Sequence, residues 1–156
     1  MIGVSAWQRS KQSVTTLLHA AATPGRLLRL SLGIVYLWFG ALKVMGVSPA
    51  VDLIRQSYPV LATPALFMGL GLSEVALAVA LISGLWKPWT AAATVGHMIG
   101  TFGVFLFSPQ VVFAPHFPCL TITGEFVAKN VVLISVALVL WREAVVPARV
   151  RARGQE

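Results

Sequence analysis

Four long apolar runs, separated by short polar segments, make up most of this sequence. They cover residues 27–47, 65–85, 89–107 and 120–141. A helix needs roughly 20 mostly apolar residues to cross the hydrocarbon core of a membrane, and each run approaches or reaches that length. The pattern predicts an all-α, polytopic membrane protein whose four transmembrane helices form an antiparallel bundle over residues 26–141.

The segments outside the runs also carry patterns. Within residues 1–25, five apolar residues recur at steps of three and four, which predicts an amphipathic helix lying on the membrane surface: Val4, Trp7, Val14, Leu18 and Ala21. We expect Pro24-Gly25 to break the chain after it. Residues 48–64 predict a short interfacial helix between prolines, residues 108–120 an uncharged loop, and residues 142–156 a basic tail.

Composition and charge agree with a membrane location. The chain is 57% hydrophobic and 11% charged, which leaves little material for a soluble domain. A net charge of +7 in a soluble protein would suggest nucleic acid, but here the basic residues stand at the ends of the apolar runs, where lipid contact and topology explain them. Nine Lys or Arg residues lie in the two terminal segments and in the loop between the second and third runs, which share one side of the membrane. In the other two loops, on the opposite side, Arg55 is the only Lys or Arg residue. This bias predicts that both termini are cytoplasmic.

Several polar residues interrupt the apolar runs and are the candidates for a buried polar or ligand-binding site: Lys43, Glu74, His97, Glu125, Lys129 and Asn130. A charge facing lipid is costly, so these side chains should face protein or water. Glu125 and Lys129 are four residues apart and can pair on one helix face. Lys43 and Glu74 form the second expected pair, and we expect the cluster to open to the outer face.

Two interpretations of this cluster stay open: a ligand or proton site, or paired charges that only orient the helices. His97 is equally a packing histidine or a functional one. A bis-histidine haem is not favoured, because His19 and His116 lie near opposite surfaces. Three aromatic residues belong to packing or a membrane belt, or else line a site for a flat hydrophobic ligand: Tyr36, Trp38 and Phe105.

The single cysteine, Cys119, excludes an intrachain disulfide and a cysteine-type metal site, and no metal is predicted. Its place in a loop allows a redox role or an inert thiol.

Small residues also recur at four-residue steps and predict close helix approach: Gly69 with Ser73, then Ala76, Ala80 and Gly84, and on the third run Ala92, Gly96 and Gly100.

Three stretches together resemble the DoxX-like family of four-helix membrane proteins, in its YkgB-like branch. They are RLSLGIVYLWFGALKV, GLGLSEVALAVALISGL and FPCLTITGEFVAKNVVLISVALVL, and the resemblance covers about Arg29 to Trp141. It implies a bacterial inner-membrane protein, linked in some members to thiosulfate:quinone oxidoreduction and in others to oxidative or reactive-chlorine stress. By this resemblance, the positions of this chain that match the family pattern are Arg29, Lys43, Glu74 and Lys129. His97 and Cys119 have no place in the shared pattern.

Three functional hypotheses follow. The first is the membrane subunit of a quinone-linked oxidoreductase, in which the cluster binds a quinone or small oxidant and handles its protons. The chain has no electron-carrying motif of its own, so a partner subunit or soluble donor is required. The second is a non-catalytic accessory subunit of a larger membrane complex. The third is a small proton-coupled transporter, which would have to form a homo-oligomer.

Overall fold

The computed structural model describes residues 23–85 and 87–146, and four of its helical segments are long and apolar enough to cross a membrane. The predicted all-α, four-span membrane protein is thereby confirmed. The first two spans are the single helices α2 (Pro24–Val44) and α4 (Pro64–Ser83), while the last two are each made of two helices: α5 (Lys87–Phe102) with α6 (Val104–Phe107), and α8 (Ile122–Ala128) with α9 (Asn130–Val145). The predicted surface helix over residues 1–22 lies outside the described residues.

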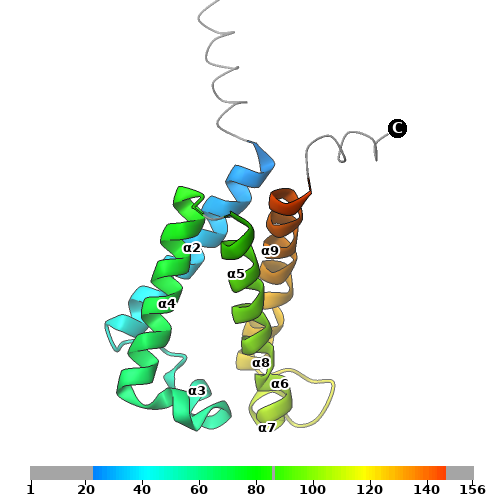
Figure 1. Ribbon diagram of the computed structural model, residues 1–156. Helices are drawn as coiled ribbons and strands as arrows, with labels where there is room; N and C mark the ends of the chain where they lie inside the picture. Colours follow the sequence, from blue (N-terminus) through cyan, green and yellow to red (C-terminus); the bar gives the residue numbers. More distant parts are fainter. Residues whose placement is uncertain (1–22, 86, 147–156) are drawn as a thin grey trace, which may run out of the picture.

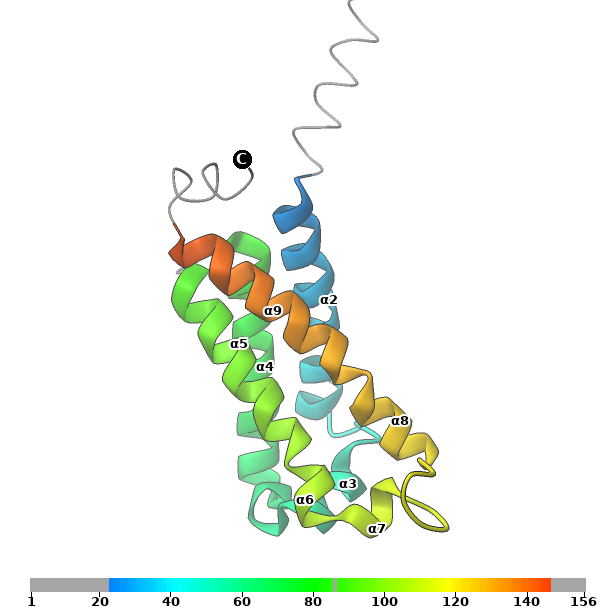
Figure 2. The same ribbon diagram turned by 90° about the vertical axis from the view of Figure 1, so that its right-hand side faces the viewer.

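Short elements connect the spans. The segment between the first two spans folds into α3 (Val51–Ser57) and the 3-10 helix η1 (Pro59–Ala62), so the short helix predicted there is present. The loop between the last two spans contains α7 (Pro109–Val112) and a bridge between Phe113 and Leu120. We call the end of the bundle that carries α3 and α7 the α3 end, and the end where α2 begins the opposite end (Figures 1 and 2).

The helix boundaries differ from the predicted ones for local reasons. Pro24 begins α2 instead of breaking the chain, because proline lacks an N–H that the first helical turn does not need. α2 ends at Val44, before Gly46, whose φ of +72° favours glycine. α9 continues to Val145, beyond the predicted Trp141, until Val146 turns extended ahead of the proline that follows it in the sequence.

The spans pack as two pairs, α2 with α4 and α5 with α9. In Figure 1 the pairs lie close together at the opposite end and diverge towards the α3 end. The α2–α4 contact depends on Gly40 and Gly71, because a Cβ on either would stand 2.9–3.0 Å from the backbone carbonyl oxygen of the other. The predicted small-residue rows do not make this contact: a Cβ added at Gly69 on α4, or at Gly96 or Gly100 on α5, would meet no atom within 4 Å.

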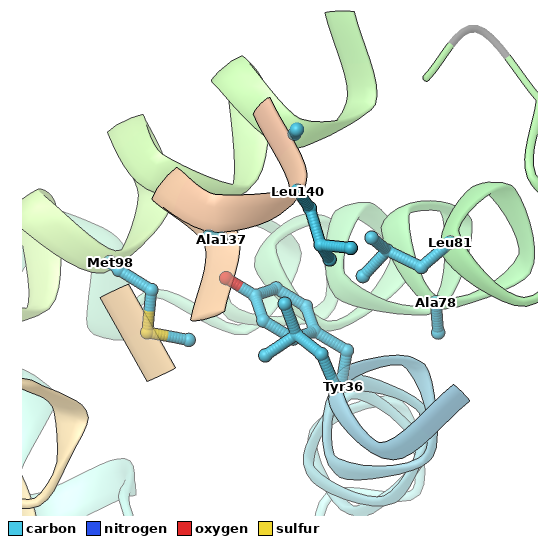
Figure 3. Packing of buried hydrophobic residues seen from close by; sticks show 8 residues of the cluster. Tyr36, Ala78, Leu81, Met98, Ala137 and Leu140 are labelled. Carbon is cyan, nitrogen blue, oxygen red and sulfur yellow. The ribbon is translucent and has the colours of Figure 1, made fainter. Parts of the chain in front are cut away.

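A cluster of buried apolar residues joins the two pairs in the half of the bundle nearer the opposite end. Its members come from all four spans: Leu32, Tyr36, Ala78, Leu81, Ala91, Met98, Ala137 and Leu140. The Tyr36 ring points away from α2 towards the segments that carry Met98 and Ala137 (Figure 3). This cluster holds the pairs together at one end and leaves room between them at the other.

Candidate functional site

The centre of the candidate site is a buried ion pair between α2 and α4. The Lys43 ammonium donates to both carboxylate oxygens of Glu74, at 2.9 Å to Oε1 and 2.7 Å to Oε2. Both side chains are buried, with 7% of each exposed. Gly71 lies one turn from Glu74 and leaves the space in which the Lys43 side chain starts. The predicted Lys43–Glu74 pair is therefore confirmed.

His97 and Tyr36 extend this pair into a chain of polar groups. His97 Nε2 lies 3.2 Å from Glu74 Oε1, and its Nδ1 lies 3.1 Å from the Tyr36 hydroxyl. The Tyr36 hydroxyl is also 3.4 Å from the Thr94 carbonyl oxygen. Counted along the helices, Tyr36 is ~18 Å from the start of α2 and Glu74 and His97 are each ~15 Å from the starts of theirs, so the chain lies near mid-span.

The arrangement accommodates His97 with one proton or with two. Nε2 faces a carboxylate, which accepts hydrogen bonds when ionised, so in the neutral ring the proton belongs on Nε2 and Nδ1 accepts from the Tyr36 hydroxyl. In the imidazolium, Nδ1–H donates to Tyr36, and the hydroxyl turns its proton to the Thr94 carbonyl oxygen. The Tyr36 hydroxyl proton can turn from His97 Nδ1 to the Thr94 carbonyl oxygen. Both forms of the ring therefore keep Tyr36 and Glu74 as hydrogen-bond partners.

Tyr36→Phe tests this hydroxyl. The variant keeps the ring in the buried cluster and removes the group between His97 and Thr94, so we expect a loss of stability of about 1 kcal/mol, as for a typical hydrogen bond. The measurement is unfolding of the purified protein in detergent micelles. Tyr58→Phe is a matched change at the α3 end of the same cavity. It should leave the NMR signals of the His97 ring unchanged, whereas Tyr36→Phe should shift them.

A cavity of about 660 Å³ lies between the two helix pairs and contains this polar chain in its wall. Tyr36 and Met98 belong both to the buried apolar cluster and to the cavity lining, so the cluster forms one end wall. Most other lining side chains are apolar and come from the spans and from α3, among them Val35, Phe39, Leu53, Ile54, Leu70, Val104, Phe126 and Leu133. Ligand pockets typically have this size and this mixture of apolar walls and a few polar groups.

Further polar groups lie along the cavity. Asn130, at the start of α9, donates to the Thr101 hydroxyl at 3.1 Å. The break between α5 and α6 in the third span therefore lies beside the break between α8 and α9 in the fourth. The Tyr58 hydroxyl donates to the Gly100 carbonyl oxygen at 2.7 Å and occupies the place of a side chain on Gly103. Burial raises the pKa of Tyr58 above its ordinary value.

Two of the predicted charged residues do not join this cluster. Glu125 and Lys129 are both exposed, neither lines the cavity, and no ion pair connects them within the described residues. The expected Glu125–Lys129 pair is therefore wrong. The physical reason is depth: the fourth span begins at Ile122, so Glu125 lies in its first turn, where a charge can reach water without a buried partner.

The remaining candidates divide in the same way. Tyr36 lines the cavity as predicted, whereas Trp38 is 67% exposed and is absent from the lining. Phe105 packs against Phe102 and Phe113 and is also absent from the lining. Cys119 is an exposed, free thiol in the loop before α8. Of the two interpretations of these rings, lining the site is wrong for Trp38 and Phe105, because nearby positions on a helix face different directions, and packing or a membrane belt remains.

Sequence reasoning missed Tyr58 and Thr101 as members of the site. Tyr58 lies in the proline-rich segment 48–64, and Thr101 is a lone hydroxyl near the end of an apolar run, so neither belongs to a recognisable motif. Both contact residues far away in the chain, at separations of 42 and 29 positions. No periodic pattern reports such a contact.

Comparison with known proteins identifies one family. A model of the DoxX family matches residues 26–109, which is 84 of the 156 residues and covers the first three spans apart from Pro24 and Gly25. No curated protein and no solved structure matches the chain. The matched region contains Tyr36, Lys43, Glu74 and His97, so the whole polar chain falls inside it.

Proposed function

Since the chain belongs to the DoxX family and spans the membrane four times, we propose that it is a redox-linked membrane subunit whose cavity binds a quinone-class molecule. The observation that carries this proposal is the Lys43–Glu74–His97–Tyr36 chain in the wall of a largely apolar cavity. A quinone has the matching chemistry: a flat apolar ring with two carbonyl oxygens that accept hydrogen bonds and, on reduction, protons.

The polar chain supplies the groups that such a ligand needs. Lys43 donates two hydrogen bonds to Glu74, and its ammonium has a third proton for a carbonyl oxygen. His97 is placed to pass a proton on, because both its ring nitrogens already have polar neighbours. The aromatic walls, Phe39 and Phe126, meet edge to face with ring centroids 5.6 Å apart and can hold a flat ring.

Electrons must come from elsewhere. Reduction of a quinone to a quinol takes two electrons and two protons, and the chain carries no electron-transfer motif. In this proposal a partner subunit or a soluble donor delivers the electrons at the membrane. The role of this chain is to bind the quinone headgroup and to move protons to it.

The test is purification from membranes in mild detergent, followed by mass spectrometry of extracted small molecules and co-eluting proteins. We expect a stoichiometric quinone with the wild type, and about tenfold weaker retention in His97→Gln, which removes the ring but no member of the ion pair. Glu125→Gln is the matched control, since it changes a span carboxylate outside the cavity and should retain the quinone. Retained partner proteins with no small molecule would instead support a non-catalytic accessory subunit.

A further inference from the structure

A second cavity, of about 480 Å³, lies at the opposite end of the bundle. All four spans contribute to it: α2 and α5 begin here, and α4 and α9 end here (Figure 1). The lining includes three cationic side chains and one carboxylate, namely Arg26, Arg29, Lys87 and Glu143. It shares no residue with the cavity that holds Glu74.

The positive side chains of this second cavity come from two helices, Arg26 and Arg29 from α2 and Lys87 from α5. Arg29 is half-buried, and its guanidinium reaches from α2 to the end of α4, where it occupies the place of a side chain on Gly84. Lys87 stands at the start of α5 on another side. Neither of these side chains, nor that of Arg26, makes a hydrogen bond or an ion pair with any part of residues 23–85 and 87–146.

Glu143 does not neutralise this charge. Its carboxylate lies against Gly25, on the α2 side of the cavity, and no ion pair within 4.0 Å connects it to the three cations in the described chain. Helix dipoles add little, because two helix starts and two helix ends meet at this end and their partial charges oppose each other. The side chains therefore leave an excess of two positive charges around one cavity.

We propose that this second cavity binds the phosphate group of an anion, presented either by a phospholipid headgroup or by free phosphate. Arginine and lysine side chains that converge from different helices suit a phosphate, which accepts hydrogen bonds on several oxygens. The cavity lies where the spans end, which is the depth of lipid headgroups in a bilayer. Basic pockets between transmembrane helices at this depth are a known means of holding anionic headgroups.

The test measures binding to the full-length protein in mixed micelles of a neutral detergent. Unfolding midpoints are followed while phosphatidylglycerol, phosphatidylcholine or inorganic phosphate is titrated in. We expect phosphatidylglycerol to raise the midpoint and Arg29→Gln to weaken its apparent affinity about fivefold, the effect of one basic residue near a membrane surface. Inorganic phosphate that competes for the site with the same dependence on Arg29 identifies free phosphate as the source.

Two further variants separate a built site from general surface charge. Arg142→Gln removes a positive charge at the same end of the bundle, from a residue outside the cavity lining, and should change the affinity little. Glu143→Gln should strengthen anion binding about fivefold, because it removes a negative charge from the lining. Equal weakening by Arg142→Gln and Arg29→Gln, or no gain from Glu143→Gln, would overturn the proposal. The Glu143 variant decides the matter even if the Arg29 variant does not fold.

Discussion

Glu74→Gln is expected to lower the free energy of unfolding by about 3 kcal/mol or more, the usual consequence of removing one partner of a buried ion pair. The variant leaves the Lys43 ammonium buried without its counter-charge and removes the carboxylate next to His97 Nε2. Only 7% of the Lys43 side chain and 17% of the His97 side chain are exposed, so water cannot fully replace the lost carboxylate. The measurement is reversible unfolding in detergent micelles, followed by circular dichroism.

The double variant Lys43→Met, Glu74→Met separates stability from ligand binding. Apolar side chains of similar length can replace a buried pair with little cost, so we expect most of the lost stability to return. Quinone binding should not return, because the Lys43 ammonium, the proposed donor to a quinone carbonyl oxygen, is gone. Glu125→Gln, an exposed carboxylate in a span, should stay within about 0.5 kcal/mol of the wild type. A Glu74→Gln protein as stable as the wild type would show that the pair contributes nothing to folding.

Gly71→Ala is the second change with a large expected effect. The added methyl would stand 2.7 Å from Lys43 Cβ and 3.0 Å from both the Gly40 carbonyl oxygen and the Val44 nitrogen. Backbone atoms cannot turn aside, so α2 and α4 must separate. We expect a loss of about 2 kcal/mol, typical of an overpacked contact. Because Lys43 lies at the same contact, quinone content should fall as well.

Gly69→Ala is the matched control, two residues away on the same helix. Its methyl would meet no atom within 4 Å. Alanine favours helix over glycine by up to about 1 kcal/mol, so this variant should be neutral or slightly stabilised. Thermal unfolding of the two variants side by side gives the comparison. Equal effects at positions 69 and 71 would contradict the close α2–α4 approach.

The four spans could be predicted from the sequence because their determinant is local. Length and apolarity decide whether a segment can cross a membrane, and both are read directly from residues such as those of 65–85. The Lys43–Glu74 pair was predictable for a related reason. A charge deep in a span must find an opposite charge, and Glu74, near the middle of its run, had few partners at a similar depth.

The composition of the site was less predictable, because it depends on which way each helix faces. Gly69 and Gly71 both stand in the same apolar run and nothing in the sequence tells them apart, yet only Gly71 contacts α2. Glu125 and Lys129 have the spacing of an ion pair, but the start of the fourth span at Ile122 leaves them near the surface and exposed. Helix rotation is determined by packing between segments, which periodicity within one nearly uniform apolar segment does not report.

The sequence by itself therefore determined the class of protein, the number of spans and the need to pair a deep charge, since lipid imposes these on each segment separately. Only the tertiary structure decided that Tyr36 meets His97, 61 positions away, and that the two helix pairs diverge around a cavity. The same holds for Arg29 and Lys87, which line one cavity because α2 and α5 begin at the same end of the bundle. Contacts of this kind arise from the packing of whole helices, and no single segment contains them.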